Sequence, residues 1–593
     1  MTLALALLGC AGTLRGEDFD GDGYRTPRDC DDRNAFVHPG AVDTPYDGID
    51  QDCSGADLTD GDGDGVDGDL DCDDRSPDVY PGAPDPPYDG IDADCGGGSD
   101  FDADHDGSDS MAFGGDDCDD SDPNRSAEDA DGDGWSSCQG DCDDDRAAVN
   151  PFAERICGNG IDDDCDGRPE CGLSGRSDFD DLDALITGLA AGDRTGRALA
   201  VVDDLDGDGR NDLAVGAYLG YDGNGAVHLI TRPRDGTLAQ DHTLLVGSGS
   251  FGFSVAPSPG GVLVGSLSGE TFQWRGAVLR FEPPFSPVMD ERDATLVLEG
   301  EAANDRAGWA VAYADLGVGW IAVGAVASDL GGTDSGAVYF VPSGLTGIHS
   351  LAQFARLRGS TQWGRAGQAL APSPDVDGDG AGDLWVGEPG STVGLPIPGS
   401  VWLVTTVPGT TVADSGVSMV GEVTRDQFGA SVAVGDANGD GLVDVLVGAP
   451  FNGAAGVEAG AAYLFLGPHT GQRLATSADL VIRGRTGYEL GTSVALVDLD
   501  GDGLDDVIVG GPGASEDSGG TAVFSAGQTG EVDVLSADAI VVGAFGSRTG
   551  VALAGGMLGG GPWNDLAIGA DEAFVTGAES GAVSVAWGGD GSF

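Results

Sequence analysis

Lysine is absent from this chain of 593 residues: all 27 basic residues are arginine, and they stand against 102 aspartates and glutamates. The absence excludes reactions that need a lysine amine, such as phosphate binding in a P-loop, Schiff-base formation and kinase-type phosphoryl transfer. The formal net charge of -75 repels phosphate backbones and anionic lipids, which argues against nucleic acid or a membrane surface as partner. Cations are the partners that this charge favours.

Catalytic signatures are also lacking. The sequence has no G-x-S-x-G and no H-E-x-x-H motif. Its six histidines are isolated, without the spacing of a metal triad: His38, His105, His228, His242, His349 and His469. Its dense carboxylate clusters all belong to the repeated loops described below, so we expect a protein that is not an enzyme. A hydrolase that acts on glycans through carboxylates outside the loops, such as Asp222 or Glu270, is a weaker alternative.

Cysteine is confined to the N-terminal part of the chain. Ten of the 11 cysteines, and about half of the acids, lie between Glu17 and Cys171. We therefore expect Cys- and Asp-rich metal-binding repeats at residues 17–175 and a separate, cysteine-free domain at residues 180–593. Paired cysteines indicate an oxidising compartment.

The first 16 residues resemble a bacterial lipoprotein signal. "MTLALALLGC" is a short apolar run that ends in Leu-Leu-Gly-Cys, which implies lipidation of Cys10. The run has no basic residue before it and is short for a signal, so either the start lies upstream or the segment is an uncleaved apolar stub. We expect an extracytoplasmic protein of the cell envelope or cell surface, or a secreted one. No later segment approaches 18 uninterrupted apolar residues.

An acidic loop occurs four times in the N-terminal region. Aspartates at loop positions 1, 3 and 5 and glycine at position 6 match the spacing of an EF-hand calcium loop, in which oxygens at positions 1, 3, 5, 7 and 12 surround the ion. The first two loops have all five positions; the third and fourth carry extra residues before the closing Asp-Cys-Asp-Asp, which leaves their geometry open. The expected ligands are Asp18, Asp20, Asp22, Tyr24 and Asp29; Asp60, Asp62, Asp64, Val66 and Asp71; Asp102, Asp104 and Asp106; and Asp129, Asp131 and Asp133.

The cysteines repeat with the loops. Cys30 and Cys53, Cys72 and Cys95, and Cys142 and Cys165 are each 23 residues apart, so we expect three disulfides within repeats, each contributing about 3 kcal/mol. The pairing of Cys118, Cys138, Cys157 and Cys171 stays open. With the following text, such as "HPGAVDTPYDGIDQDC", the unit resembles the metal-binding repeat of MopE-like bacterial surface proteins. That resemblance implies copper as an alternative, but copper prefers imidazole or sulfur, and only His38 and His105 are available; calcium is favoured.

A shorter acidic loop occurs four times in the second domain, as in "DLDGDGRNDLAVGA". Oxygens at positions 1, 3, 5 and 9, a backbone carbonyl at position 7 and glycine at position 6 form a loop that fits within a β-hairpin. The expected calcium ligands are Asp204, Asp206, Asp208, Arg210 and Asp212; Asp375, Asp377, Asp379, Ala381 and Asp383; Asp436, Asn438, Asp440, Leu442 and Asp444; and Asp498, Asp500, Asp502, Leu504 and Asp506.

A Gly-x-x-x-Ala segment surrounds these loops with a longer period. Its glycine recurs seven times, 56 to 62 residues apart, at Gly196, Gly252, Gly308, Gly367, Gly429, Gly491 and Gly550. Each period contains four strand-sized runs, and the acidic loop joins the first two, which predicts the blades of a β-propeller. The last period lacks its fourth run, whereas "ALITG" (184–188) precedes the first. We therefore expect the N-terminal strand to complete the last blade and close the ring.

The repeats resemble FG-GAP repeats, and the domain resembles the seven-bladed propeller of integrin α subunits; "FGASVAVGDANGDGLVDVLVGAP" fits the motif almost throughout. The resemblance implies about four calcium ions, in blades 1, 4, 5 and 6, because blades 2, 3 and 7 keep their strands but lose the ligands. We expect up to four further ions in the N-terminal repeats. The expected role of calcium is structural.

The expected function is that of a calcium-stabilised surface protein that mediates adhesion or binds a protein or glycan, without catalysis. The loops between strands 2 and 3 vary most, and Tyr221, Trp274 and Phe451 in them are either anchors for a partner or part of the blade packing. A protein that mainly sequesters metal at the surface is the alternative.

Overall fold

The computed structural model describes residues 17–105, 107–123, 125, 129–151, 153, 161–162, 165, 175–233, 236–237, 242–267, 275–390, 397–406, 411–412, 416–514, 518–559, 563–574 and 579–589. By their contacts the residues form two compact units: one of Met1–Ala153 and Asp163–Cys165, the other of Glu154–Asp162 and Asp166–Phe593. Within the described part, no helix is both long enough and apolar enough to cross a membrane.

The N-terminal unit is built from loops. Its described regular elements are two short 3-10 helices, η1 (Met111–Phe113) and η2 (Ser137–Gln139). Three repeats bury a valine at the same point, Val37, Val79 and Val149, each at most 9% exposed. Such small cores need covalent support, which disulfides supply: Cys30–Cys53, Cys72–Cys95 and Cys142–Cys165, as the equal spacing led us to expect, and also Cys118–Cys138. Cys10, Cys157 and Cys171 lie outside the described residues.

Tyrosines connect successive repeats of this unit. The Tyr46 hydroxyl donates to the carbonyl of Thr59 in the second repeat, and the Tyr88 hydroxyl donates to Asp120 in the third. Hydrogen bonding to Asp74 and Asp120, respectively, raises the pKa of both tyrosines to about 12. The first and second repeats therefore each contact the repeat that follows.

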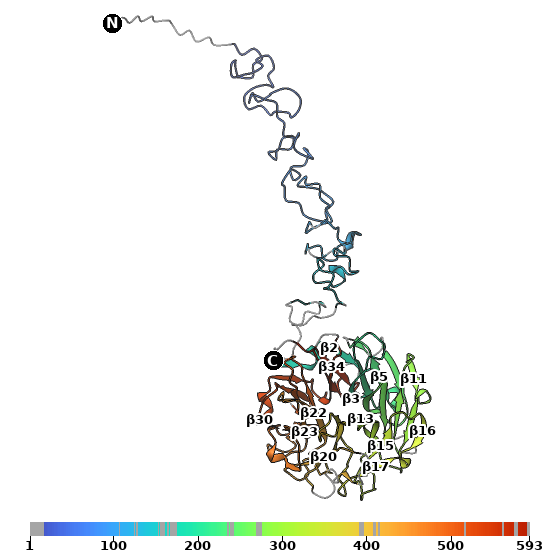
Figure 1. Ribbon diagram of the computed structural model, residues 1–593. Coiled ribbons are helices and arrows are strands. Elements are labelled where there is room, and N and C mark those ends of the chain that lie inside the picture. The colour runs from blue at the N-terminus through green and yellow to red at the C-terminus, as the bar shows by residue number, and fades with distance from the viewer. Residues whose placement is uncertain are drawn as a thin grey trace, which may run out of the picture. The chain divides into compact units, whose positions relative to one another are not determined.

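The second unit is a seven-bladed β-propeller, which confirms the expected fold (Figure 1). Four antiparallel strands make each blade. The first three blades contain β3 (Thr195–Val202), β4 (Asp212–Ala217), β5 (Ala226–Ile230) and β7 (His242–Val246); β8 (Phe251–Ser258), β9 (Gly261–Ser266), β10 (Ala277–Phe281) and β12 (Leu296–Glu299); and β13 (Ala307–Asp315), β14 (Gly319–Ala325), β15 (Ala337–Pro342) and β17 (Ala355–Arg358). A four-residue helical turn, α1 (Gly220–Gly223), lies between β4 and β5.

The remaining blades follow the same order. They contain β18 (Leu370–Ser373), β19 (Asp383–Glu388), β20 (Ser400–Val404) and β21 (Ser418–Val420); β22 (Ser431–Gly435), β23 (Asp444–Ala449), β24 (Ala461–Phe465) and β26 (Leu480–Arg483); β27 (Ser493–Val497), β28 (Asp506–Gly511), β29 (Gly520–Phe524) and β31 (Ala539–Val542); and β32 (Thr549–Gly556), β33 (Asp565–Ala570), β34 (Ala582–Ala586) and β2 (Ala184–Thr187). The second strands are almost wholly buried, so the apolar run after each acidic loop is core.

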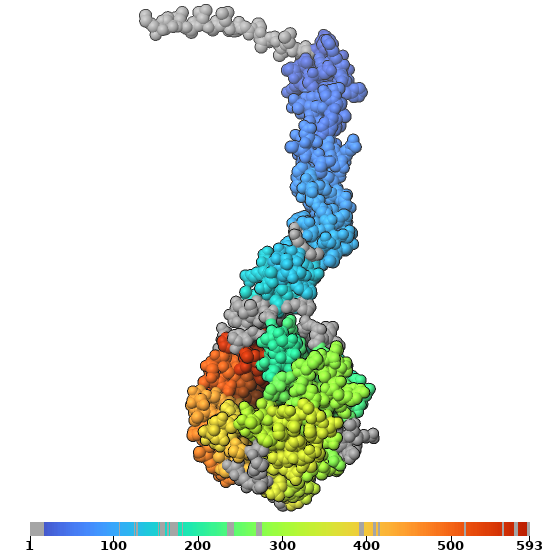
Figure 2. All heavy atoms as spheres, turned by 45° about the vertical axis from the view of Figure 1, so that its right-hand side comes forward, coloured from blue at the N-terminus to red at the C-terminus, as the bar shows by residue number. Residues whose placement is uncertain are grey.

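Ring closure occurs as expected, because β2 pairs antiparallel with β34 and places Ile186 opposite Val583. The two strands lie side by side in Figure 1, and in Figure 2 the blue-green start of the propeller borders its red C-terminal blade. Ion pairs bridge the same seam, since Arg194 in the approach to β3 pairs with Glu572 and Glu579 after β33. In the closed ring, every blade packs against a blade on each side.

A fifth strand, parallel to the fourth, extends six of the seven sheets in the described structure, which corrects the expectation of four strands in each period. The connection between strands 3 and 4 of the next blade supplies it in five cases, and the segment before β2 supplies it beside blade 6; a 3-10 turn follows in most cases. The strands are β11 (Val288–Asp290), β16 (Gly347–Ser350), β25 (Gln472–Leu474), β30 (Gly530–Asp533), β1 (Gly175–Asp178) and β6 (Gly236–Thr237); the turns are η4 (Glu291–Asp293), η5 (Leu351–Gln353), η7 (Ala475–Ser477), η8 (Val534–Ser536) and η3 (Phe179–Asp181). In blade 3 a bridge from Arg358 to Thr411 takes this place.

The recurring glycine is required by the contact between blades. Gly196 has a φ of 87°, and a Cβ there would lie 2.4 Å from the carbonyl oxygen of Ala582 in the adjoining blade. Such an approach excludes any side chain. The period seen in the sequence is therefore the period at which a first strand contacts the third strand of the adjoining blade.

Candidate metal-binding loops and the central channel

The four acidic loops of the propeller have one hydrogen-bond pattern. The carboxylate at position 1 (Asp204, Asp375, Asp436 or Asp498) accepts from the backbone N–H groups of the glycines at positions 4 and 6, over 2.6–3.1 Å. The carboxylate at position 9 accepts from the residue at position 2, as Asp212 does from Leu205 at 2.8 Å. Backbone N–H groups thus hold the carboxylates at positions 1 and 9 in place.

Oxygens without a hydrogen bond remain inside these loops. One carboxylate oxygen of Asp212 and one of Asp383 are buried and accept no hydrogen bond. Burial, and secondarily the neighbouring loop aspartates, raise the pKa of Asp212 to about 7 and that of Asp383 to about 6. Buried carboxylates that lack partners are costly, and a divalent cation among them would remove that cost. The donor set, all oxygen, fits Ca²⁺.

The loops of blades 5 and 6 differ in one respect. The second oxygen of Asp444 accepts from Gly467 N–H at 2.8 Å, and that of Asp506 accepts from Ala526 N–H at 3.1 Å. Blade 7, which has no acidic loop, keeps Asp565 at position 9, where it accepts from Leu558 and Gly588. The position 9 aspartate therefore also ties strands 1 to 3 of a blade together, a role that the spacing alone did not indicate.

The N-terminal loops also gather carboxylates, and Asp20, Asp22 and Asp29 place three oxygens within 4.8 Å of one another. Each of these residues has a buried oxygen that accepts no hydrogen bond, and the same is true of Asp62, Asp64 and Asp71 in the second loop. Burial raises the pKa of Asp29 and Asp62. In the first loop, the residues at positions 3, 5 and 12 thus lie close together.

The closing residues of the third and fourth loops are Asp117 and Asp141. Both are at most 5% exposed, and each has a buried oxygen that accepts no hydrogen bond. Inserted residues displace them from position 12, so counting from the loop start missed them; their position directly before a cysteine, as in Asp29-Cys30, is the signal that finds them. Asp106, expected in the third loop, lies outside the described residues.

A second set of aspartates supports the loops. The last residue of each Asp-Cys-Asp-Asp segment accepts a hydrogen bond from the N–H of loop position 2: Asp74 from Gly61 at 2.7 Å, Asp120 from Ala103 at 2.8 Å and Asp144 from Ala130 at 2.9 Å. Asp32 accepts from Phe19 at 3.4 Å. Sequence reasoning did not select these residues, although their fixed distance from the cysteine marks them.

The ligand atoms of the N-terminal unit suit copper less well than calcium. All eight described cysteines are in disulfides, so they provide no thiolate. The ring of His38 stacks on Tyr24 of its own repeat, with the ring centroids 4.9 Å apart. His105 belongs to a different repeat. Imidazole and sulfur, which copper prefers, are therefore not assembled from these residues.

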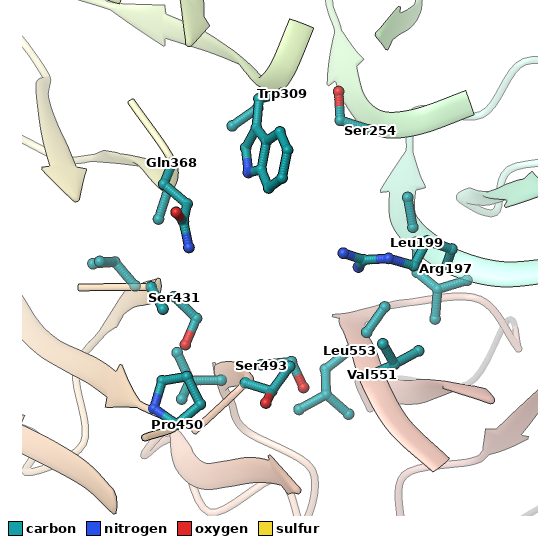
Figure 3. Close-up of a pocket in the computed structure, with 18 of the residues that line it drawn as sticks. Arg197, Leu199, Ser254, Trp309, Gln368, Ser431, Pro450, Ser493, Val551 and Leu553 are labelled. Atoms are coloured by element: carbon teal, nitrogen blue, oxygen red, sulfur yellow. The ribbon is translucent and has the colours of Figure 1, made fainter. Parts of the chain in front are cut away.

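The seven first strands surround a channel with a cavity of about 430 Å³. Its mouth is lined by the residue that follows each recurring glycine: Arg197, Phe253, Trp309 and Gln368 in blades 1 to 4, and Ala430, Thr492 and Val551 in blades 5 to 7 (Figure 3). Loops between blades and the loop after β23 also line it, so the mouth opens on the face of the 2-3 loops. A ring of leucines and valines, including Leu199 and Leu553, lies beside this one.

The candidate anchors on this face have different surroundings. Tyr221 is 55% exposed, whereas Phe451 is half-buried and lines the channel mouth. Asp222, considered above as a carboxylate outside the loops, is exposed. Trp274 and Glu270 lie outside the described residues.

Two sequence families account for parts of the chain. The Cu-binding MopE motif matches residues 29–57, 71–100 and 141–170, and the FG-GAP repeat matches residues 195–230, 428–465 and 490–535. The chain contains FG-GAP repeats and MopE-type motifs. The matches coincide with three of the cysteine repeats and with blades 1, 5 and 6.

Animal proteins with related sequence include integrin alpha-5 of Xenopus laevis, 34% identical over 163 residues, which are 25% of this chain and 15% of that protein. Integrin alpha-PS2 of Drosophila melanogaster is 31% identical over 223 residues, 34% of this chain and 15% of its own length. Phosphatidylinositol-glycan-specific phospholipase D of Bos taurus is 33% identical over 184 residues, 28% of this chain and 21% of its own length. The chain thus spans about a fifth or less of each of these relatives.

Proposed function

We propose that the protein is a calcium-stabilised extracytoplasmic surface protein whose propeller binds a protein or glycan partner without catalysis. The observation that carries the proposal is the set of buried loop carboxylates with unpaired oxygens, in a closed ring that leaves one face free of acidic loops. Four ions would be held in blades 1, 4, 5 and 6 by the ligand sets given above, and up to four in the N-terminal repeats.

Calcium would act structurally in this proposal. Without an ion, Asp204, Asp206 and Asp208 stand close together at like charge, and Asp212 adds a buried carboxyl. The loop joins the two innermost strands of its blade, so an ion there stabilises the hairpin that forms the channel wall. Sites of this kind in extracellular modules bind calcium at roughly 0.1 to 1 mM.

The partner would meet the face of the 2-3 loops. The strand order places the acidic loops, which join strands 1 and 2, on the opposite face, and the channel mouth with Phe451 opens among the 2-3 loops. The resemblance to integrin α propellers supports a binding role. The disulfides support an oxidising, extracytoplasmic location, and lipidation at Cys10 would attach the protein to the envelope.

A metal-sequestering protein is the second candidate, because each of two N-terminal loops collects three unpaired carboxylate oxygens. An enzyme is less well supported. The phospholipase D relative shares sequence with only 28% of this chain, and the buried carboxylates described above are arranged as cation ligands.

The proposal is tested by binding measurements on the full chain. Calcium-loaded and chelated protein are applied to arrays of glycans and of cell-surface proteins, next to a Tyr221→Ala variant and a Val318→Ala control; Val318 is exposed in the 1-2 loop of blade 3, on the opposite face. We expect calcium-dependent binding that Tyr221→Ala weakens and Val318→Ala leaves unchanged. Tight uptake of many ions together with no binding on either array would favour sequestration and overturn the adhesion proposal.

A further inference from the structure

Arg197 has a partly buried side chain whose guanidinium makes no hydrogen bond to the described residues. Its side chain is 32% exposed, and its nearest carboxylate oxygen, on Asp571, is 4.0 Å from Nε. It donates no hydrogen bond to any residue in the described part of the chain; its other close contact is the ring of Phe253, 5.1 Å from the guanidinium carbon. In Figure 3 the guanidinium points into the channel.

Two other shielded arginines in the propeller donate hydrogen bonds from their guanidinium groups. Arg483, with a side chain 14% exposed, donates to Glu422 and to Tyr463. Arg280 donates to the carbonyl oxygens of Ser343 and Leu345. Arg197 differs from these two because it faces a cavity; since partly buried charge without hydrogen bonds is costly, a ligand from outside the chain would stabilise it there.

Two further donors face the same space. The indole N–H of Trp309 and the side-chain amide of Gln368 have no hydrogen-bond partner among the residues that the structure describes, and both line the cavity with Arg197. Phe253 stands between Arg197 and Trp309, its ring centroid 4.9 Å from that of Trp309. Blades 1, 3 and 4 therefore present donors without partners, and Phe253 of blade 2 contacts the first two of them.

The residues on the opposite side of the channel mouth have small side chains. Ala430, Thr492 and Val551 occupy in blades 5 to 7 the positions of the four large residues. The small side chains of blades 5 to 7 leave space beside the large side chains of blades 1 to 4. Seven large side chains would fill this space.

We propose that the channel mouth binds a carboxylate carried on an apolar stem, with the Arg197 guanidinium as its main partner and Trp309 and Gln368 as further donors. An arginine fork matches the two oxygens of a carboxylate. The proposal rests on the proposed binding function and deepens it, since the mouth opens on the face assigned to the partner.

The walls of the channel indicate the apolar stem. The ring of leucines and valines offers no hydrogen bonds, and the serine hydroxyls nearby are already used: Ser254, Ser431 and Ser493 donate to carbonyl oxygens of the next first strand at 2.7–2.8 Å. A sugar ring would leave several hydroxyls unpaired there. Glu489 is the one carboxylate of the described lining and belongs to blade 6, which disfavours an extended polyanion.

Calorimetric titration of the calcium-loaded full chain tests the inference with 3-phenylpropanoate and its uncharged amide. We expect binding of the acid and at least tenfold weaker binding of the amide. A blocked Leu-Glu-Leu peptide and its Leu-Gln-Leu analogue then ask whether the carboxylate source is a protein side chain or a small acid; preference for glutamate or preference for the free small acid both support a carboxylate site.

Variants separate this site from general effects. Arg197→Gln should weaken binding of the acid at least tenfold, Arg197→Lys should weaken it less, and Ala430→Leu should block entry. The control is Arg292→Gln, whose side chain is 88% exposed beside β11. Equal affinity for acid and amide, or unchanged binding by Arg197→Gln, would overturn the inference. Melting is measured with and without chelator on the same samples. If chelator still lowers Tm while Arg197→Gln binds the acid normally, the carboxylate site fails and the proposed calcium role stands.

Discussion

Ile186 lies in β2, the strand that the N-terminal segment adds to the last blade, and it is 4% exposed. Its side chain packs in a cluster with Leu213 and Ile230 of blade 1 and Val583 of blade 7. Replacing a buried isoleucine by alanine removes apolar contacts and leaves a cavity, which typically costs 2–5 kcal/mol. We expect about 3 kcal/mol for Ile186→Ala, because the cluster around it is closely packed on both sides.

The effect on melting follows from the size of the ring. With an unfolding entropy of about 2.1 cal/mol/K per residue, a cooperative unit of about 400 residues loses about 4 °C in Tm for 3 kcal/mol. The matched control is Ile348→Ala, the same substitution in β16 at the outer rim, where the side chain is 71% exposed. That change should alter stability by no more than about 0.5 kcal/mol. Differential scanning calorimetry of both variants in calcium compares them.

The closure argument fails if Ile186→Ala and Ile348→Ala shift Tm equally. It also fails if Ile186→Ala melts in two steps in which only the last blade is lost early, because a closed ring should transmit the loss to all blades. A single transition at lower temperature is the expected result.

Further predictions concern the seam, a buried acid and an N-terminal loop. Arg194→Ala removes the cation shared by Glu572 and Glu579, although Glu572 keeps Arg548 at 3.5 Å, and should lower stability by about 1–3 kcal/mol; an unchanged Tm would refute the role of these ion pairs. Burial raises the pKa of Asp426 to about 7, so its contribution to stability is complete below pH about 4 and is lost as the pH rises through 7, by about 1.4 kcal/mol per pH unit. Relative to wild type, Asp426→Asn should therefore gain stability between about pH 4 and 7 in denaturant titrations, and a constant difference would contradict this. Asp117→Asn should bind one calcium ion fewer by native mass spectrometry, with an unchanged ion count as the contrary outcome.

Much of the propeller could be predicted because its period is long and regular. The recurring glycine and the apolar runs give the number of blades, and counting fourth strands located the closing strand at Ala184–Thr187. The fifth strands could not be found in this way. They are two to four residues long and pair with a neighbouring blade, and β1 reads Gly-Arg-Ser-Asp, which carries no apolar signal.

In the acidic loops, too, some residues could be predicted from the sequence and others could not. Spacing predicts a ligand set in Asp204 to Asp212 because the five expected ligand positions are contiguous in sequence. Asp117 and Asp141 were missed because inserted residues change their distance from the loop start while the fold restores their position in space. Arg197 was missed for another reason: a residue that follows a recurring glycine acquires a binding role only when seven such residues meet around one channel.

The central claim, that calcium stabilises this fold through its acidic loops, is tested most directly by calorimetry of the full chain across a calcium titration and in excess chelator, with bound ions counted by native mass spectrometry. We expect up to eight bound ions, about four of them in the propeller, and a large fall in Tm when chelator removes them. Little calcium uptake and the same Tm in calcium and in chelator would contradict it.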